Sequence, residues 1–174
     1  MIERLTEGTA GGKKVIGPDK TVNNGDVIVI GDTSFRIHHT GPAHTDSDIM
    51  IEVVDQKVLF TGDVVRNGML GLMELDSSFK GNIAAIDWMV QKKFKHYIPG
   101  HGRAGGVKIV RAYRAYLDKL LTTVKKLYAK NLSDHEMKPA VLQAVSAYKN
   151  WGGFDLMLGP HVSRAYLEVE AEAF

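Results

Sequence analysis

The chain has 174 residues, 44% hydrophobic and 24% charged, which is typical of one soluble globular domain and excludes disordered and fibrous classes. Its 22 basic and 20 acidic residues are interleaved, so the net charge of +2 does not predict a nucleic-acid partner. No run approaches the roughly 20 apolar residues of a membrane helix, and the first residues lack the apolar core of a signal peptide. We therefore expect a soluble chain with no membrane partner.

The sequence contains no cysteine. Disulfides, cysteine nucleophiles and thiolate metal sites are therefore excluded, and any zinc must be held by histidine and carboxylate side chains. The absence of cysteine fits both cytoplasm and periplasm, so the sequence leaves the compartment unknown.

Short runs of β-branched residues predict strands in the first third of the chain. The runs cover residues 27–30, 35–37, 49–54 and 58–60. Turn-forming pairs such as Gly31-Asp32 and Asp55-Gln56 separate them, and these two breaks are short enough for hairpins. We therefore expect an antiparallel meander.

Two of these runs, 27–30 and 49–54, are nearly continuously apolar rather than alternating. Such strands are typical of a sheet that is covered on both faces. The helices that follow the strands can cover only one face of the sheet. The sequence leaves three candidates for what covers the other face. These are a second sheet from a missing segment, another copy of the chain, or the C-terminal helices.

After Gly62 the spacing of apolar residues becomes helical. The predicted helices span residues 82–92, 107–129, 133–148 and 160–173, with a short strand over 94–98. Ser133 and Glu136 fit a capping box, and Pro160 fits the first turn of the last helix.

These elements predict a mixed α/β (α+β) fold with a mostly antiparallel sheet and helices on one face. We expect one domain over residues 1–174, with the sheet in residues 13–104 and a C-terminal helical extension over residues 105–174.

Three segments place a potential metal ligand where a predicted strand gives way to a loop. They contain His44, Asp63 and His101, each near a glycine or a proline. Metal sites are often assembled at strand ends, because the sheet fixes the backbone while the loop bends toward a shared point. Two imidazoles and one carboxylate form a borderline-hard ligand set that suits zinc, with iron and manganese as alternatives.

The motifs around these residues resemble those of a known family. The segments GPAHTDSD, KVLFTGD and IPGHG, within residues 14–103, are similar to the second half of the metallo-β-lactamase superfamily. They are most similar to its zinc hydrolases associated with quinoprotein relay and sulfur-oxidation systems, and the tail GPHVSRAYLEVE resembles the end of those proteins. The resemblance implies a half or truncated αββα sandwich.

The same resemblance implies a role for each ligand. His44 would complete the three-histidine set of one zinc, Asp63 would bridge both metals as the catalytic carboxylate, and His101 would bind the second zinc. The HxHxDH motif, which supplies the other ligands in the family, has no counterpart upstream of His44. A complete site would hold one or two Zn2+, whereas this chain alone would hold one or none.

Neighbouring residues allow more than one interpretation. Asp48 is a candidate for orienting a ligand imidazole from behind, or for capping the turn before the next strand. His39 is interpreted as a strand-end or surface residue. His161 is interpreted as a helix-start residue, with an approach to the site as the alternative that the tail resemblance implies. Trp151 is interpreted as a core aromatic, with a substrate-lining role as the alternative.

The leading hypothesis is a zinc-dependent hydrolase, in which metal-activated water attacks an ester, thioester, amide or phosphoester of a small-molecule substrate. Its activity would require a complementing N-terminal half. The alternative is a catalytically incompetent half-domain that acts as an oligomerisation or binding module, with two copies packed sheet to sheet as a homodimer. A third hypothesis is the diiron redox branch of the same fold.

Overall fold

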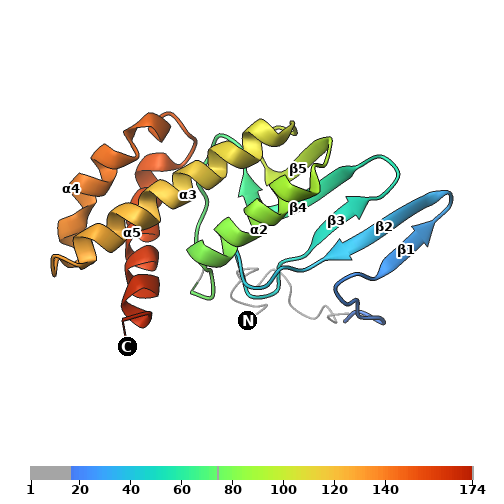
Figure 1. Ribbon diagram of the computed structural model, residues 1–174, viewed down its shortest axis with the longest axis horizontal. Coiled ribbons are helices and arrows are strands. Elements are labelled where there is room, and N and C mark those ends of the chain that lie inside the picture. The colour runs from blue at the N-terminus through green and yellow to red at the C-terminus, as the bar shows by residue number, and fades with distance from the viewer. Residues whose placement is uncertain (1–16, 74, 174) are drawn as a thin grey trace, which may run out of the picture.

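A mixed sheet forms the first part of the fold in the computed structural model, which describes residues 17–73 and 75–173. Its strands are β1 (Val27–Ile30), β2 (Thr33–His38), β3 (Met50–Val53), β4 (Val58–Arg66) and β5 (His96–His101), side by side in that order (Figure 1). The pairs from β1 to β4 are antiparallel, and β4 pairs with β5 in parallel. The predicted meander is confirmed. The predicted start of the family-like segment near residue 14 lies outside the described residues.

The helices follow the sheet and then extend away from it. They are α2 (Phe79–Lys92), α3 (Val107–Tyr128), α4 (Asp134–Ala144) and α5 (Phe154–Ala171), with a 3-10 turn at Ser146–Tyr148. The helices α2 and α3 lie against the sheet, whereas α4 and α5 pack on α3 at the end of the molecule away from β1 (Figure 1). The predicted mixed α/β class is confirmed. None of the described helices is long and apolar enough to cross a membrane.

Strand β4 is longer than its apolar run predicts. The prediction ended it at Phe60, but it continues through Gly62 to Arg66, which pairs with His101 of β5. Gly62 has a φ of 53°, which favours glycine, and the register with β5 shifts on both sides of it. Because a bulge re-aims the side chains that follow it, Asp63 is presented from within the strand rather than from a loop after it.

The helix boundaries that differ most from the prediction are the start of α5 and the end of α4. Helix α5 begins at Phe154, not at Pro160, and its N-cap is Gly153 with a φ of 72°. The buried side chain of Phe154 anchors this extra first turn in the core, so the helix forms despite the proline inside it. Helix α4 has the predicted capping box of Ser133 and Glu136, but it ends at Ala144, where the backbone tightens into the 3-10 turn.

Alternation along the strands gives the sheet two different faces. On one face the ring of His38 packs against that of Trp88 of α2, and Leu59 is fully buried. On the opposite face, Ile51 and Phe60 are register partners, and Phe60 is 42% exposed. The described helices thus cover one face, and the other presents apolar side chains.

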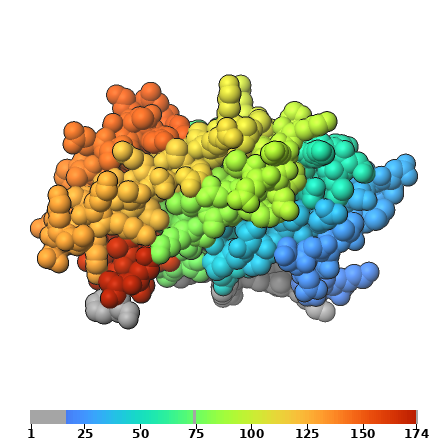
Figure 2. All heavy atoms as spheres, in the orientation of Figure 1, coloured from blue at the N-terminus to red at the C-terminus, as the bar shows by residue number. Residues whose placement is uncertain are grey.

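Strand β1 is exposed on both faces, against the prediction that the sheet is covered on both. Val29 and Ile30 point to opposite sides and are 65% and 66% exposed. In the space-filling view the blue end of the molecule that contains β1 stands clear of α2 and α3 (Figure 2). The C-terminal helices lie at the other end, so they do not cover this strand (Figure 1).

Candidate functional site

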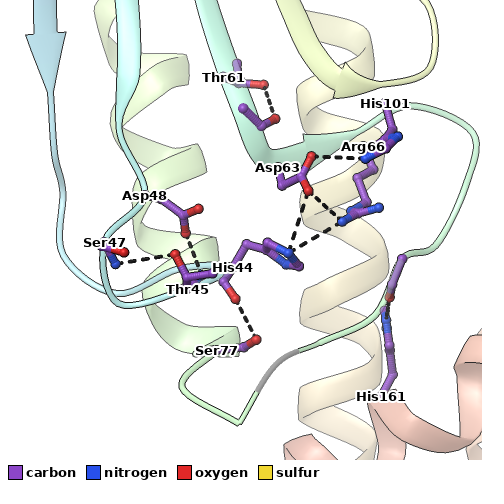
Figure 3. Close-up of polar contacts among 12 residues, drawn as sticks. His44, Thr45, Ser47, Asp48, Thr61, Asp63, Arg66, Ser77, His101 and His161 are labelled. Atoms are coloured by element: carbon purple, nitrogen blue, oxygen red, sulfur yellow. Dashed lines mark hydrogen bonds and ion pairs between the residues drawn. The ribbon is translucent and has the colours of Figure 1, made fainter. Parts of the chain in front are cut away.

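The three predicted ligands come together at one end of β4 and β5. Asp63 follows the bulge in β4, His101 ends β5, and His44 lies in the loop between β2 and β3 (Figure 3). Neighbouring parallel strands end at the same edge of a sheet, so the topology itself brings Asp63 and His101 together. Gly100 is required at this edge, because a Cβ there would overlap Oδ1 of Asp63.

Asp63 lies between the two imidazoles, and each of its oxygens faces a different one (Figure 3). Its Oδ2 is 3.6 Å from Nε2 of His44, and its Oδ1 is 3.5 Å from Nε2 of His101. The His44 side chain is only 11% exposed, whereas that of His101 is 49% exposed. The site therefore has a buried side at His44 and an open side at His101.

Sequence reasoning missed a fourth charged residue, Arg66. Its Nη2 donates to Oδ2 of Asp63 at 2.8 Å and lies 3.5 Å from Nε2 of His44. The only signal in the sequence is an arginine three residues after Asp63 in an apolar strand, and it becomes meaningful once β4 is known to continue past Gly62. The Arg66 side chain is 8% exposed, so its charge is buried, whereas the Asp63 side chain is 29% exposed.

Gly71 and His161 hold Arg66 in place. A Cβ at residue 71 would overlap the guanidinium, so the backbone packs directly on it. Nε2 of His161 donates to the carbonyl oxygen of Gly71 at 2.7 Å, because a carbonyl can only accept, and Nδ1 then accepts from the hydroxyl of Tyr116 at 2.9 Å. Burial lowers the pKa of His161 to about 4, in keeping with this neutral tautomer.

The helix-start interpretation of His161 is therefore wrong. The residue lies in the middle of α5 and is fully buried, because the helix begins six residues before Pro160. The same burial acts on Tyr113, where desolvation raises the pKa to about 12 and keeps the hydroxyl protonated. Trp151 packs against Tyr113 and Tyr116, as expected of a core aromatic.

Helix α5 also supports the loop that carries His44. The hydroxyl of Ser77 donates to the carbonyl oxygen of His44 at 2.6 Å, and Nε of Arg164 donates to the carbonyl oxygen of Ser77 at 2.8 Å. Within the same loop, Oδ2 of Asp48 accepts from the backbone N–H of Thr45 at 2.6 Å, which is a turn cap. The structure thus gives Asp48 a contact with the backbone of the loop.

The donors fit part of a zinc site rather than a whole one. Among residues 17–73 and 75–173, no group of three or more His, Cys, Asp or Glu side chains is arranged to hold one metal ion. Each side of Asp63 offers one imidazole and one carboxylate oxygen, whereas zinc takes about three or four protein ligands. The described residues therefore complete neither coordination set around Asp63.

Comparison with known proteins identifies the family. The family model described as "Metallo-beta-lactamase superfamily" matches residues 3–101, so the chain belongs to this superfamily. The chain is 29% identical over 85 residues to the human protein "Acyl-coenzyme A thioesterase MBLAC2", a match that covers 49% of this chain and 25% of that protein. It is 28% identical over 110 residues to an uncharacterized protein of Aquifex aeolicus, covering 60% of this chain and 50% of that protein.

Solved structures show the same fold. A metallo-beta-lactamase from Pontibacter korlensis aligns with a TM-score of 0.53 at 24% identity, over 66% of this chain and 54% of that one. The sec-alkylsulfatase Pisa1 from Pseudomonas sp. aligns with a TM-score of 0.64 at 19% identity, over 88% of this chain and 27% of that one. The chain thus spans about half or less of the length of these relatives.

Proposed function

We propose that the chain contributes the Asp63-centred part of a metallohydrolase site, with His44, Asp63 and His101 as donors. One observation carries this proposal, namely that the two oxygens of Asp63 face two different imidazoles at 3.6 and 3.5 Å. A carboxylate between two imidazoles is the arrangement expected of a bridging ligand, and membership of the superfamily supports the assignment. The remaining donors would come from a complementing segment.

Zinc bound in the completed site would supply a water of pKa near ~7, hence hydroxide at neutral pH. The residues of this chain would then have different roles in the site. Asp63 is held by the buried guanidinium of Arg66, which orients the carboxylate. His101 lies on the exposed side, so a substrate approaches the site there, and α5 fixes the loop of His44 from behind.

We propose a thioester as the first substrate class to test, because curated relatives matched over about half of this chain are named acyl-coenzyme A thioesterases. The other classes, namely esters, amides and phosphoesters, require the same attack by metal-activated water on an electrophilic centre. An acyl-coenzyme A panel that varies only in the acyl chain would separate recognition of the acyl group from hydrolysis itself.

The decisive test is zinc binding by variants of the full chain. We expect Asp63→Ala to bind zinc at least about tenfold more weakly than the wild type, because it removes the donor shared by both positions. His101→Ala should have the same effect on the open side. The measurement is equilibrium dialysis with elemental analysis.

His96→Ala is the matched control, since it removes an exposed histidine from the other end of β5. It should leave zinc binding unchanged. Thioester hydrolysis by the chain, or by the assembly that contains it, should fall to the uncatalysed rate in Asp63→Ala. A wild-type chain that takes up no more zinc than Asp63→Ala would refute the proposal.

A second candidate function rests on a different observation. Strand β1 and the face of the sheet opposite α2 expose apolar side chains, among them Ile30, Ile51 and Phe60, of which Ile30 and Phe60 are 66% and 42% exposed. A binding module that associates through this face would need no complete metal site. The two functions differ in what they predict for self-association and for metal uptake.

A further inference from the structure

The two oxygens of Asp63 are not equivalent. On the Oδ2 side, Nη2 of Arg66 lies 2.8 Å from the carboxylate and 3.5 Å from Nε2 of His44. A metal bound by His44 and Oδ2 would have to lie between these same two atoms. On the Oδ1 side, the described residues place the imidazole of His101 at 3.5 Å, and that side chain is half exposed.

The guanidinium of Arg66 has little freedom to leave its place. Its side chain is 8% exposed, and the backbone of Gly71 lies against it so closely that a Cβ there would overlap it. Gly71 is itself fixed through its carbonyl oxygen by His161, which Tyr116 holds from the other side. The buried position of the charge is thus built by β4, the loop after it, α3 and α5.

A guanidinium stays charged at every pH a protein survives, and it repels a divalent cation at close range, most strongly where water is excluded. The surroundings of His44 are such a place, because the side chains of His44 and Arg66 are about nine-tenths buried. A metal ion and this guanidinium therefore compete for the same two donor groups. On the open side, His101 leads to solvent and carries no such competitor among the described residues.

We propose that Arg66 is a built-in cation that takes the position between His44 and Asp63, and that a divalent metal bound in the completed site is therefore restricted to the His101 side. The inference rests on the proposed function, since it assumes that Asp63 and the two histidines are donors. It adds to that function that the site is asymmetric, with a metal position on the His101 side of Asp63 and the guanidinium of Arg66 on the His44 side. Arg66 is here a positioning residue and a substitute for a metal.

The test is the zinc stoichiometry of the full chain with and without this charge. The wild type should bind at most one zinc. Arg66→Met, which keeps the length of the side chain, should gain a second zinc or bind zinc at least about tenfold more tightly. The double variant Arg66→Met/His44→Ala should lose that gain, while Arg111→Met on the exposed surface of α3 is the control for lost charge.

Thermal unfolding gives a second measurement of zinc binding, and it does not require the protein to be saturated with zinc. Without metal, Arg66→Met should be less stable than the wild type, since Asp63 loses its partner, and added zinc should raise its Tm more than that of the wild type. If Arg66→Met fails to fold, Arg66→Gln replaces it in the same series. Arg66→Lys keeps the charge and should behave as the wild type.

Equal zinc uptake and equal zinc-induced shifts in wild type and Arg66→Met would overturn the inference. These outcomes leave the proposed function standing if Asp63→Ala and His101→Ala still lose zinc. If those two variants bind zinc as the wild type does, the proposed function fails instead, and the failure is recognisable as such.

Discussion

At the scale of the residue, His161 shows how a buried side chain far from solvent can support the site. Its ring joins Tyr116 to the carbonyl oxygen of Gly71 and is needed in its neutral form. Burial lowers its pKa from 6.5 to about 4. Protonation would place a charge in the core and abolish the bond accepted from Tyr116.

The pH dependence of stability follows from this shift. Because the folded-state pKa is depressed, the stabilisation is fully present above pH 6.5 and is lost as the pH falls through about 4. We expect His161 to contribute about 3 kcal/mol to the loss of unfolding free energy over this range, at about 1.4 kcal/mol per pKa unit. His161→Gln cannot titrate, so its stability should fall less between pH 7 and pH 4.

Urea unfolding of both proteins at the two pH values measures the difference. His96→Gln, at the exposed end of β5, serves as the control and should follow the wild type. Parallel pH profiles for wild type and His161→Gln would show that the buried ring does not titrate in this range.

At the scale of the element, α5 holds the start of α2 as well as the site. Glu168 of α5 accepts hydrogen bonds from the backbone N–H groups of Phe79 and Lys80 at 2.6 and 2.9 Å, and from the hydroxyl of Ser78 at 3.1 Å. These N–H groups are the free donors of the first helical turn, where a negative charge is favourable. The carboxylate thus caps a helix to which it does not belong.

Glu168→Ala should lower the free energy of unfolding by about 1–2 kcal/mol, the usual effect of losing an N-cap together with a favourable charge. Hydrogen exchange should show the amides of Phe79 and Lys80 exchanging faster, with little change in α3. Glu170→Ala removes a carboxylate from the same helix and is the matched control. Equal stability of the two variants would mean that Glu168 is not an effective cap.

The sequence predicted those elements whose periodicity is local. The strands of the meander, the long helix α3 and the capping box of Ser133 follow from patterns within a few residues, and the structure has them. The start of α5 was missed because the burial of Phe154 depends on distant packing, whereas Pro160 is a strong local signal. Local rules therefore fail where tertiary contacts decide a boundary.

The residues of the site also fall into those that local sequence patterns predict and those that depend on distant contacts. Turn residues around His44, Asp63 and His101 mark these positions along the chain, and the structure brings them together at one sheet edge. Arg66 could not be predicted, because its contact with Asp63 depends on a bulge at Gly62 and on continued pairing with β5. The role of a charged residue such as Arg66 in an apolar strand can be inferred only when its partner, here Asp63, is known.

At the scale of the whole molecule, the sheet has one covered and one apolar face. Ile28, Ile30, Phe35, Ile37 and Ile51 line a shallow groove on the face away from α2. A flat apolar face can pack on its own copy about a twofold axis, since each copy then offers the same surface, and sheets stack in this way in sandwiches. A second copy of the chain is therefore the occupant that the next pair of variants tests.

Strand β1 offers a matched pair of variants for this idea, because Val29 and Ile30 are equally exposed, at 65% and 66%, and point to opposite faces. If two copies pack through the face away from α2, Ile30→Lys should dissociate them, since it would bury a charge without a partner, while Val29→Lys should not. Light scattering after size-exclusion chromatography, over a series of concentrations, measures the mass. A wild-type monomer throughout the series, or equal effects of the two lysines, would remove the sheet-to-sheet dimer and leave the metallohydrolase proposal as the one function that the structure supports.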